Sequence, residues 1–294
     1  MTSEASRSLT VKSLLLPLLM RPRITQYIKW IVYLSLIVNF GIYIYDDWIA
    51  YISAMASDAL WFKVVEQFST SIDMAAWLGL VFLFELETYA LPDEAFKKGV
   101  AKAIHTARII CYLFVIYAAY GYTALALDNH KVTELVDLTE LCQIADQGTA
   151  VQLDVVTYTQ ITSENCGTIP ADTPFYQIAD DISVIDGRAL DHVQKLGWFD
   201  VVNAVAWLIV VLLIEIEVRM QWGDRFDNST LKFVRYANTA FYGVLIFNAI
   251  IWLVTGYPVY VWDAFLWIFG FWAIELNLAE WQEERESKFI AAVQ

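Results

Sequence analysis

Apolar residues dominate six stretches of the chain, and short polar or charged segments separate these stretches. They lie near 28–46, 72–90, 108–127, 199–218, 236–256 and 260–279. A transmembrane helix needs about 20 mainly apolar residues, so each stretch is long enough to cross a bilayer. A soluble helical protein with buried helices is disfavoured, because charged loops separate the long apolar runs. The pattern therefore predicts an all-α polytopic membrane protein with six transmembrane helices.

The second, fourth and sixth stretches repeat one arrangement of polar positions. An Asp or Asn is followed by Trp four residues later, by Glu eight residues after the Trp, and by Glu or Asn two residues further on. The three copies are Asp73, Trp77, Glu85 and Glu87; Asn203, Trp207, Glu215 and Glu217; and Asp263, Trp267, Glu275 and Asn277. A basic residue lies near the start of each preceding helix, at Lys29, Arg108 and Arg235. Such repeats are common in membrane proteins, and we expect three pseudo-repeated helical hairpins.

Helical geometry separates the two acids at the end of each copy. At 100° per residue, Asp73, Trp77 and Glu87 share one stripe of the helix, while Glu85 lies on another face. The first polar residue of each copy lies one turn from the Trp. Because a buried indole N–H needs a hydrogen-bond acceptor, we expect a repeated outer clasp. Its members are Asp73 with Trp77, Asn203 with Trp207, and Asp263 with Trp267.

The acids near the ends of the three copies have two interpretations. Ionisable residues at membrane depth face the protein interior, where they pair or line a pathway. In the first interpretation they form ion pairs: Glu85 with Arg108 or Lys29, Glu215 with Arg219 or Arg235, and Glu275 with Arg235 or another inner basic residue. In the second, a ring of carboxylates near the inner leaflet collects cations or protons.

Basic residues are distributed unevenly over the predicted topology. With a cytoplasmic N-terminus, fifteen of the nineteen Lys and Arg residues fall on the cytoplasmic side, and only Lys63, Lys131, Arg188 and Lys195 fall outside. Cytoplasmic loops carry the excess of basic residues in membrane proteins. We therefore expect a multi-pass protein of the cell membrane, in a bacterial inner membrane, with both termini cytoplasmic. The predicted domains are a cytoplasmic or interfacial segment (1–27), three helices (28–127), an acidic extracytoplasmic domain (128–197), three helices (198–281) and a cytoplasmic tail (282–294).

The segment between the third and fourth helices differs in character from the rest of the chain. Residues 128–195 hold twelve Asp or Glu against three Lys or Arg, and they are too many for a simple connection. Val and Thr alternate in part over 150–162, which predicts a strand or hairpin. Cys142 and Cys166 both lie here, where an oxidising compartment favours a disulfide bond.

Composition and charge agree with the membrane class and argue against several others. The chain is 58% hydrophobic and 18% charged, with a net charge of −14, and the acidic outer segment argues against nucleic acid as a partner. We identify no phosphate-binding loop or nucleophile motif. The three histidines, His105, His130 and His192, form no facing pair inside a predicted span, so no haem is expected. We expect no catalytic site, no cofactor and no metal.

Two of the hairpins resemble the first two helices of voltage-sensor domains. The resemblance rests on Asn39 with the sequence FLFE (Phe82 and Glu85), and on Asn248 with WAIE (Trp272 and Glu275). It implies a helical hairpin with a mid-depth Asn and an acid near the cytoplasmic end. The chain departs from that family because no helix carries Arg or Lys at every third position. It also lacks a glycine-rich filter between its last two helices.

Two functions remain open from the sequence. The first is a cation- or proton-conducting channel or transporter that uses the inner-leaflet carboxylates. The second is a non-catalytic scaffold or accessory subunit of a larger membrane complex, with the same carboxylates in structural ion pairs. The expected partners are the lipid bilayer, a monovalent cation or proton, and further copies of the chain or other membrane subunits.

Overall fold

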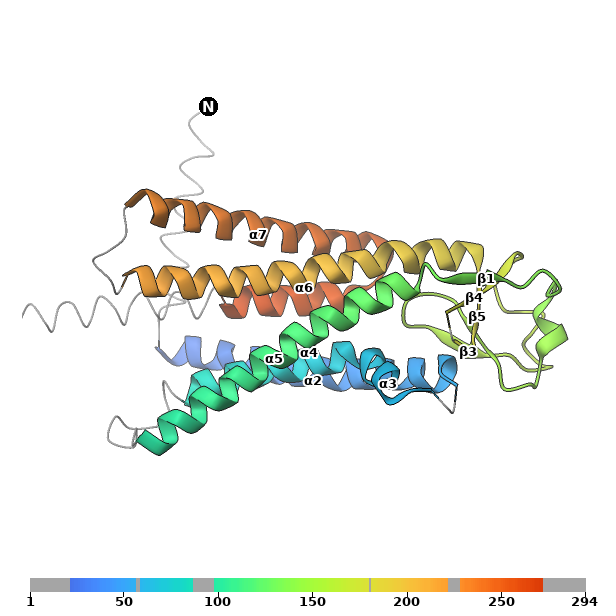
Figure 1. Cartoon of the computed structure of the whole chain (residues 1–294), viewed down its shortest axis with the longest axis horizontal. Coiled ribbons are helices and arrows are strands. Elements are labelled where there is room, and N and C mark those ends of the chain that lie inside the picture. Colours follow the sequence, from blue (N-terminus) through green and yellow to red (C-terminus); the bar gives the residue numbers. More distant parts are fainter. Residues whose placement is uncertain (1–21, 57–58, 87–97, 180, 222–227, 272–294) are drawn as a thin grey trace, which may run out of the picture. The chain divides into compact units, whose positions relative to one another are not determined.

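Helices make up most of the computed structural model, which describes residues 22–56, 59–86, 98–179, 181–221 and 228–271. Figure 1 shows these helices together with a small sheet. The helices are α2 (Pro22–Ala54), α3 (Trp61–Gln67), α4 (Ser69–Glu85), α5 (Lys98–Asp128), α6 (Gly187–Gln221), α7 (Asn228–Thr255) and a further helix, Pro258–Phe271. Where they are described, the six apolar stretches are almost entirely helical. Several helices extend beyond the apolar stretches and include the polar residues at their ends.

Several of these helices could span a membrane. In the described part of the chain, four helices are long and apolar enough: Tyr27–Ala54, Gly99–Asp128, Gly187–Glu217 and Ser229–Thr255. The pair α3 and α4 passes the same test when the two are taken together, but they are bent by 65° at the break between them. The helix Pro258–Phe271 is shorter and ends where the described residues end. Four or five of the described helices could therefore span a membrane, while six spans and the three-fold repeat stay predictions.

The chain forms two compact units, whose boundaries fall inside α2 and α7. One unit comprises Met1–Asn39 and Ala249–Gln294, and the other comprises Phe40–Asn248. In the first unit, α7 ends at Gly256, which has φ +93°. The N–H of Tyr257 donates to the Trp252 carbonyl at 2.8 Å and that of Gly256 to the Leu253 carbonyl at 3.3 Å. This pattern terminates a helix with a glycine in the left-handed conformation, and Pro258 then starts the next helix, as proline favours.

In the second unit, small residues allow neighbouring helices to approach closely. The helix α5 packs against both α4 and α6. A Cβ atom placed on Gly121 of α5 would lie 1.9 Å from the Ser69 hydroxyl oxygen of α4. A Cβ on Gly197 of α6 would lie 3.2 Å from the Asn129 side chain. Small residues at helix interfaces are typical of membrane bundles, and Gly121 is the tightest of these contacts.

A five-stranded sheet connects α5 to α6 (Figure 1). Its strands are β1 (Val132–Glu134), β2 (Ala150–Gln152), β3 (Tyr158–Gln160), β4 (Phe175–Ile178) and β5 (Val184–Asp186), in the order β1-β4-β5-β2-β3. The pair β2 and β5 is parallel, and the other pairs are antiparallel. Strands β2 and β3 form the hairpin predicted over 150–162, so that prediction is confirmed.

The two faces of the sheet bury different clusters. Val184 of β5 packs with Val151 and Phe175 on one face, while its neighbour Ile185 packs with Leu190 and Val193 of α6 on the other. Successive side chains of a strand point to opposite faces, so one short strand serves both clusters. The second cluster attaches the sheet to the first turns of α6. Asp186 also caps α6, because its Oδ1 accepts the Ala189 N–H at 2.6 Å.

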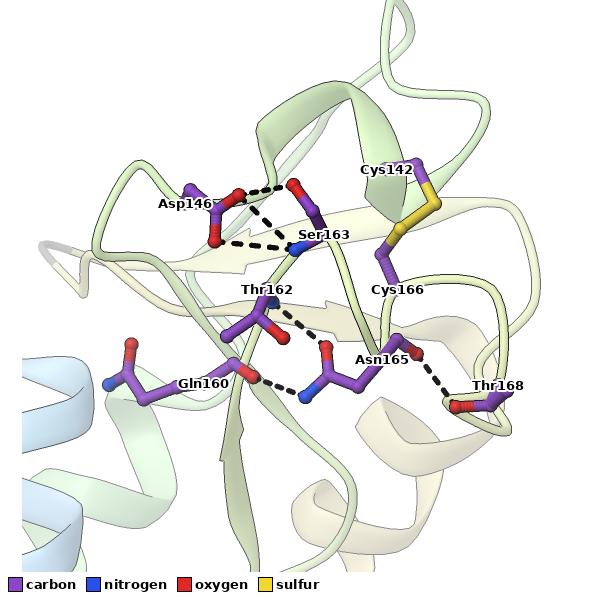
Figure 2. Close-up of a disulfide and its surroundings, with 8 residues drawn as sticks. All are labelled: Cys142, Asp146, Gln160, Thr162, Ser163, Asn165, Cys166 and Thr168. Atoms are coloured by element: carbon purple, nitrogen blue, oxygen red, sulfur yellow. Dashed lines mark hydrogen bonds between the residues drawn. A yellow bond between two sulfur atoms is a disulfide. The ribbon is translucent and has the colours of Figure 1, made fainter.

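A disulfide bond joins Cys142 to Cys166 (Figure 2). The prediction from their shared segment is confirmed, and Cys111 is free. Side chains fix the backbone on either side of the bond. Asp146 accepts hydrogen bonds from the Ser163 backbone and hydroxyl, and the Asn165 Nδ2 donates to the Gln160 carbonyl at 2.9 Å. The disulfide therefore closes a loop that already has its own hydrogen-bond network.

Candidate functional site

Asp47 is a buried carboxylate of α2 that binds the start of α4. The residue is 7% exposed. Its Oδ2 accepts hydrogen bonds from the Ser71 backbone N–H at 2.9 Å and from the Ser71 hydroxyl at 2.6 Å. The first N–H groups of a helix have no acceptor within the helix, and Ser71 is the third residue of α4. Asp47 therefore caps α4 from a neighbouring helix, where the positive end of the α4 dipole stabilises its negative charge.

A second carboxylate, Asp73 of α4, is bonded to a tyrosine of α5. The Tyr122 hydroxyl donates to Asp73 Oδ2 at 3.4 Å. Thr70, which precedes Ser71 in α4, lies near both the Asp47 carboxyl group and the Tyr122 phenol. Polar groups of α2, α4 and α5 therefore lie close together around Asp47 and Tyr122.

A third carboxylate lies near the same phenol. Tyr122 interacts electrostatically with Asp200 of α6 as well as with Asp73 and Asp47. Carboxyl groups from three helices therefore lie within electrostatic range of one tyrosine of a fourth helix. Because an isolated charge at membrane depth costs about 2.5 kcal/mol or more, such a grouping calls for a structural or functional reason.

Two amide oxygens lie at the turn of α6 that carries Asp200. Asn248 of α7 is 1% exposed, and its Nδ2 donates to the Phe199 carbonyl at 3.2 Å. Asn203 follows Phe199 by one helical turn. The Oδ1 atoms of Asn248 and Asn203 are buried and receive no hydrogen bond from any described residue. Because buried polar groups are normally bonded, and water is the usual partner where protein supplies none, this turn offers two acceptors for water.

The sheet contributes acids at the end of α2. Asp46, the neighbour of Asp47, interacts electrostatically with Asp154 in the turn between β2 and β3. Burial, followed by the nearby carboxylates of Asp181 and Asp154, raises the pKa of Tyr158 above its ordinary value. That phenol therefore stays protonated at neutral pH. The β2–β3 turn thus places a carboxylate within electrostatic range of Asp46.

An ion-pair network lies beside the bend between α3 and α4. The Lys63 ammonium group contacts Glu66 Oε2 at 3.1 Å and Asp128 Oδ2 at 2.5 Å. Lys131 contacts the other oxygen of Asp128 at 2.7 Å. Glu66 is 4% exposed, so its charge needs such a partner. This network joins α3 to the end of α5.

The residues of the predicted outer clasp all lie in the described part of the chain, with contacts between helices. The rings of Trp77 and Trp207 are 6.2 Å apart, and Trp207 also contacts Tyr242 at 6.5 Å. In the other unit, Asp263 Oδ1 accepts a hydrogen bond from Asn39 Nδ2 at 3.0 Å, and Trp267 lies one turn beyond Asp263. The bonds that we expected between each Trp and the polar residue of its copy stay predictions.

One of the predicted inner acids, Glu217, forms an ion pair with Arg235. Arg235 Nε donates to Glu217 Oε1 at 2.7 Å, although the pattern favoured Glu215 as the partner of Arg235. Glu215 and Arg108 both interact electrostatically with Tyr112. Lys29 lies 5.9 Å from the ring centroid of Tyr33, and Glu85 is described at the end of α4. Glu87, Glu275, Asn277 and the side chain of Arg219 lie outside the described residues.

The Glu217–Arg235 pair is expected to contribute little to stability. The side chains are 21% and 57% exposed, and exposed pairs contribute about 0–1 kcal/mol. Glu217→Gln should therefore lower the free energy of unfolding in detergent by about 1 kcal/mol or less. The double change with Arg235→Gln should cost no more than the two single changes together. A loss of about 3–5 kcal/mol for the single change, as for a buried pair, would show that this pair is enclosed.

Sequence reasoning missed the residues that link the helices. Thr70, Ser71 and Tyr122 are ordinary side chains in an apolar pattern, and Asp200 precedes the repeated motif. One signal was available: the adjacent acids Asp46 and Asp47 stand eight and seven residues before the end of α2. Two acids inside an apolar run are costly unless they have partners, so this pair could have been selected.

Comparison of the chain with protein-family models, with curated proteins and with solved structures found no match. The class of the protein therefore rests on its own residues. Four or five apolar helices among the described residues are compatible with a multi-pass integral membrane protein.

Proposed function

We propose that this chain is a non-enzymatic membrane protein that conducts protons or a small monovalent cation across the cell membrane. The observation that carries the proposal is the pair of carboxylates among apolar helices, with Asp47 buried against Ser71 and Asp73 bonded to the Tyr122 hydroxyl at 3.4 Å. Acids inside a bundle of apolar helices are costly to bury, and they often mark ion and proton pathways. The orientation that we propose has both termini in the cytoplasm and the sheet outside, and the distribution of basic residues favours it.

The site of conduction in this proposal differs from the one that the sequence pattern favoured. Asp47 and Asp73 conduct the ion, and Glu217 acts as the structural partner of Arg235. Support comes from the hydroxyl groups of Ser71 and Tyr122, which are bonded to Asp47 and Asp73. Ion conduction needs carboxylates that can exchange hydrogen-bond partners, whereas a carboxylate in an ion pair stays with one partner.

Flux through reconstituted vesicles tests this proposal. The purified chain, incorporated into liposomes with a pH-sensitive dye inside, is expected to dissipate an imposed proton or Na⁺ or K⁺ gradient faster than empty liposomes. Liposomes that contain chain unfolded by heat before reconstitution serve as the control for leakage. Equal rates with the native chain, the unfolded chain and no protein, for all three ions, would contradict conduction.

A scaffold function is the second candidate, and the ion pairs favour it. Lys63 with Glu66 and Asp128, and Arg235 with Glu217, each join two helices through opposite charges. Such pairs stabilise an arrangement of helices without further activity. The absence of any flux in the experiment above, from a chain that remains folded, is the result that this candidate predicts.

A further inference from the structure

We propose that three aromatic side chains, Trp77 of α4, Trp207 of α6 and Tyr242 of α7, form the constriction that limits ion flux and sets the size of the ion that passes. We refer to these three residues as the aromatic layer. The inference rests on the proposed function and deepens it, because it names the residues that determine selectivity, whereas Asp47 and Asp73 bind the ion.

The rings of the aromatic layer contact one another across three helices. The ring centroids of Trp77 and Trp207 are 6.2 Å apart, with 60° between the ring planes. Trp207 meets Tyr242 edge to face at 6.5 Å. Aromatic pairs favour such distances and angles. Trp77 and Trp207 are each 7% exposed, so two of the largest side chains fill the space between α4 and α6 at this level of the bundle.

Polar side chains lie on both sides of the aromatic layer along these helices. Asp73 and Asn203 each precede the tryptophan of their own helix by one turn, or about 6 Å at 1.5 Å per residue. In the other direction, Glu217 follows Trp207 by about 15 Å along α6, and there it accepts a hydrogen bond from Arg235 of α7. The rings therefore separate two polar levels of the bundle, and the carboxylates that we assign to conduction lie on one side of them.

A separate observation places water next to the aromatic layer. The buried Oδ1 atoms of Asn203 and Asn248 receive no hydrogen bond from any described residue, and water is the usual partner of such groups. The Phe199 carbonyl accepts the Asn248 Nδ2 at 3.2 Å, and in an α-helix the same carbonyl accepts the N–H of Asn203. Both amide groups therefore lie at one turn of α6, just before Trp207.

The rings are suited to stop that water. An indole has one N–H donor and no acceptor, so Trp77 and Trp207 offer no atom that replaces the oxygen of water around an ion. Hydrophobic constrictions block ions by excluding water. Flux then depends on how far the rings separate, and a bulky cation is excluded where a small one passes.

Flux of ions of different size through liposomes tests the inference. Trp207→Leu removes the central ring and keeps an apolar side chain, and Trp207→Ala removes more volume. Both are expected to raise the flux of protons and K⁺ at least tenfold and to admit choline, which the wild type excludes. Trp207→Phe keeps a ring and should resemble the wild type. Trp198→Ala is the matched control on the same helix, since Trp198 is 41% exposed and bonds to His130 at 3.1 Å.

Two checks separate an open constriction from a damaged bundle. Size-exclusion elution and thermal unfolding confirm that each variant is folded, and a trapped dye larger than choline must stay inside the vesicles. Trp77→Leu removes the partner ring from α4, so it provides a second test if Trp207→Ala and Trp207→Leu do not fold. It should admit choline as well.

The outcomes separate the inference from the proposed function. Choline flux in folded Trp207→Leu or Trp77→Leu, with none in the wild type, Trp207→Phe or Trp198→Ala, would support the constriction. Wild-type flux that keeps its rate and its size limit in the folded Trp207→Leu and Trp77→Leu variants would overturn the inference. It would assign the rings to packing alone and leave conduction in place. No flux of any ion, from the wild type or any folded variant, would overturn the proposed function itself.

Discussion

Replacing Gly121 with alanine is expected to be strongly destabilising. The new Cβ would lie 1.9 Å from the Ser69 hydroxyl oxygen and 3.0 Å from the Ser69 Cβ. Ser69 is fully buried, and its hydroxyl donates to the Glu66 carbonyl at 2.6 Å, so it has no free space to enter. The helices α4 and α5 must then separate, and overpacking of this kind costs about 1–3 kcal/mol, occasionally more.

A second substitution, at Ser69, shows whether the contact between residues 121 and 69 causes the loss of stability. Ser69→Gly removes both atoms that the new Cβ meets, so Gly121→Ala should cost little or nothing in that background. Residues in contact show such non-additivity, while distant ones do not. Gly99→Ala on the same helix, where nothing lies within 4 Å of the new Cβ, is the matched control and should be neutral or slightly stabilising. Thermal unfolding in detergent measures all four; equal losses from Gly121→Ala with and without Ser69→Gly would contradict the close approach.

Two substitutions of Asp47 should separate its structural role from its functional role. Asp47→Ala leaves the Ser71 N–H and hydroxyl without an acceptor in a buried place, and each unsatisfied group costs about 1–3 kcal/mol. Asp47→Asn keeps an oxygen that can accept both hydrogen bonds. We therefore expect Asp47→Ala to lower the free energy of unfolding by about 3 kcal/mol, and Asp47→Asn by about 1 kcal/mol or less, because only the charge is lost.

Unfolding of the two variants under identical detergent conditions checks this expectation. Ser71→Ala is a useful third variant, since it removes the 2.6 Å hydroxyl bond and leaves the backbone bond. Its loss should fall between those of the other two. Equal losses from Asp47→Ala and Asp47→Asn would show that the charge, and not the capping of α4, is what Asp47 contributes to stability.

The apolar pattern predicted the helices because it depends on local spacing. The runs around 108–127 and 199–218 coincide with α5 and α6, and the partial alternation over 150–162 coincides with the β2–β3 hairpin. The disulfide between Cys142 and Cys166 followed from a shared compartment. Each of these features is set by residues close in sequence or by composition, so one sequence was sufficient.

Contacts between helices could not be obtained in the same way. Whether Asp46 or Asp47 faces a neighbour depends on the rotation of α2, and whether it meets Ser71 depends on where α4 begins. The 65° bend between α3 and α4 places Ser69, Thr70 and Ser71 in the first turn of α4, with no proline or glycine there to signal it. The repeated Asp-Trp-Glu pattern drew attention to the ends of the helices, while the hydroxyl groups that bond to Asp47 and Asp73 carry no sequence signature.

The interpretation of the inner acids changes for a related reason. Helical spacing put Glu217 on the same stripe as Trp207, which made Glu217 a candidate for transport. The spacing does not determine which long side chain of a neighbouring helix contacts Glu217. Arg235 of α7 donates to Glu217, so this carboxylate is held in an ion pair between two helices. Asp47, whose partners are hydroxyl and N–H groups, has no such cation among the bonds that hold it.

Ion flux in liposomes from two matched acid-to-amide variants tests the central claim most directly. Asp47→Asn and Glu217→Gln each remove one carboxylate and retain the shape of the side chain. The account predicts that Asp47→Asn loses flux at least tenfold while Glu217→Gln conducts like the wild type, with both proteins folded. Loss of flux in Glu217→Gln together with full flux in Asp47→Asn would contradict it, and would place the pathway at the inner acids instead.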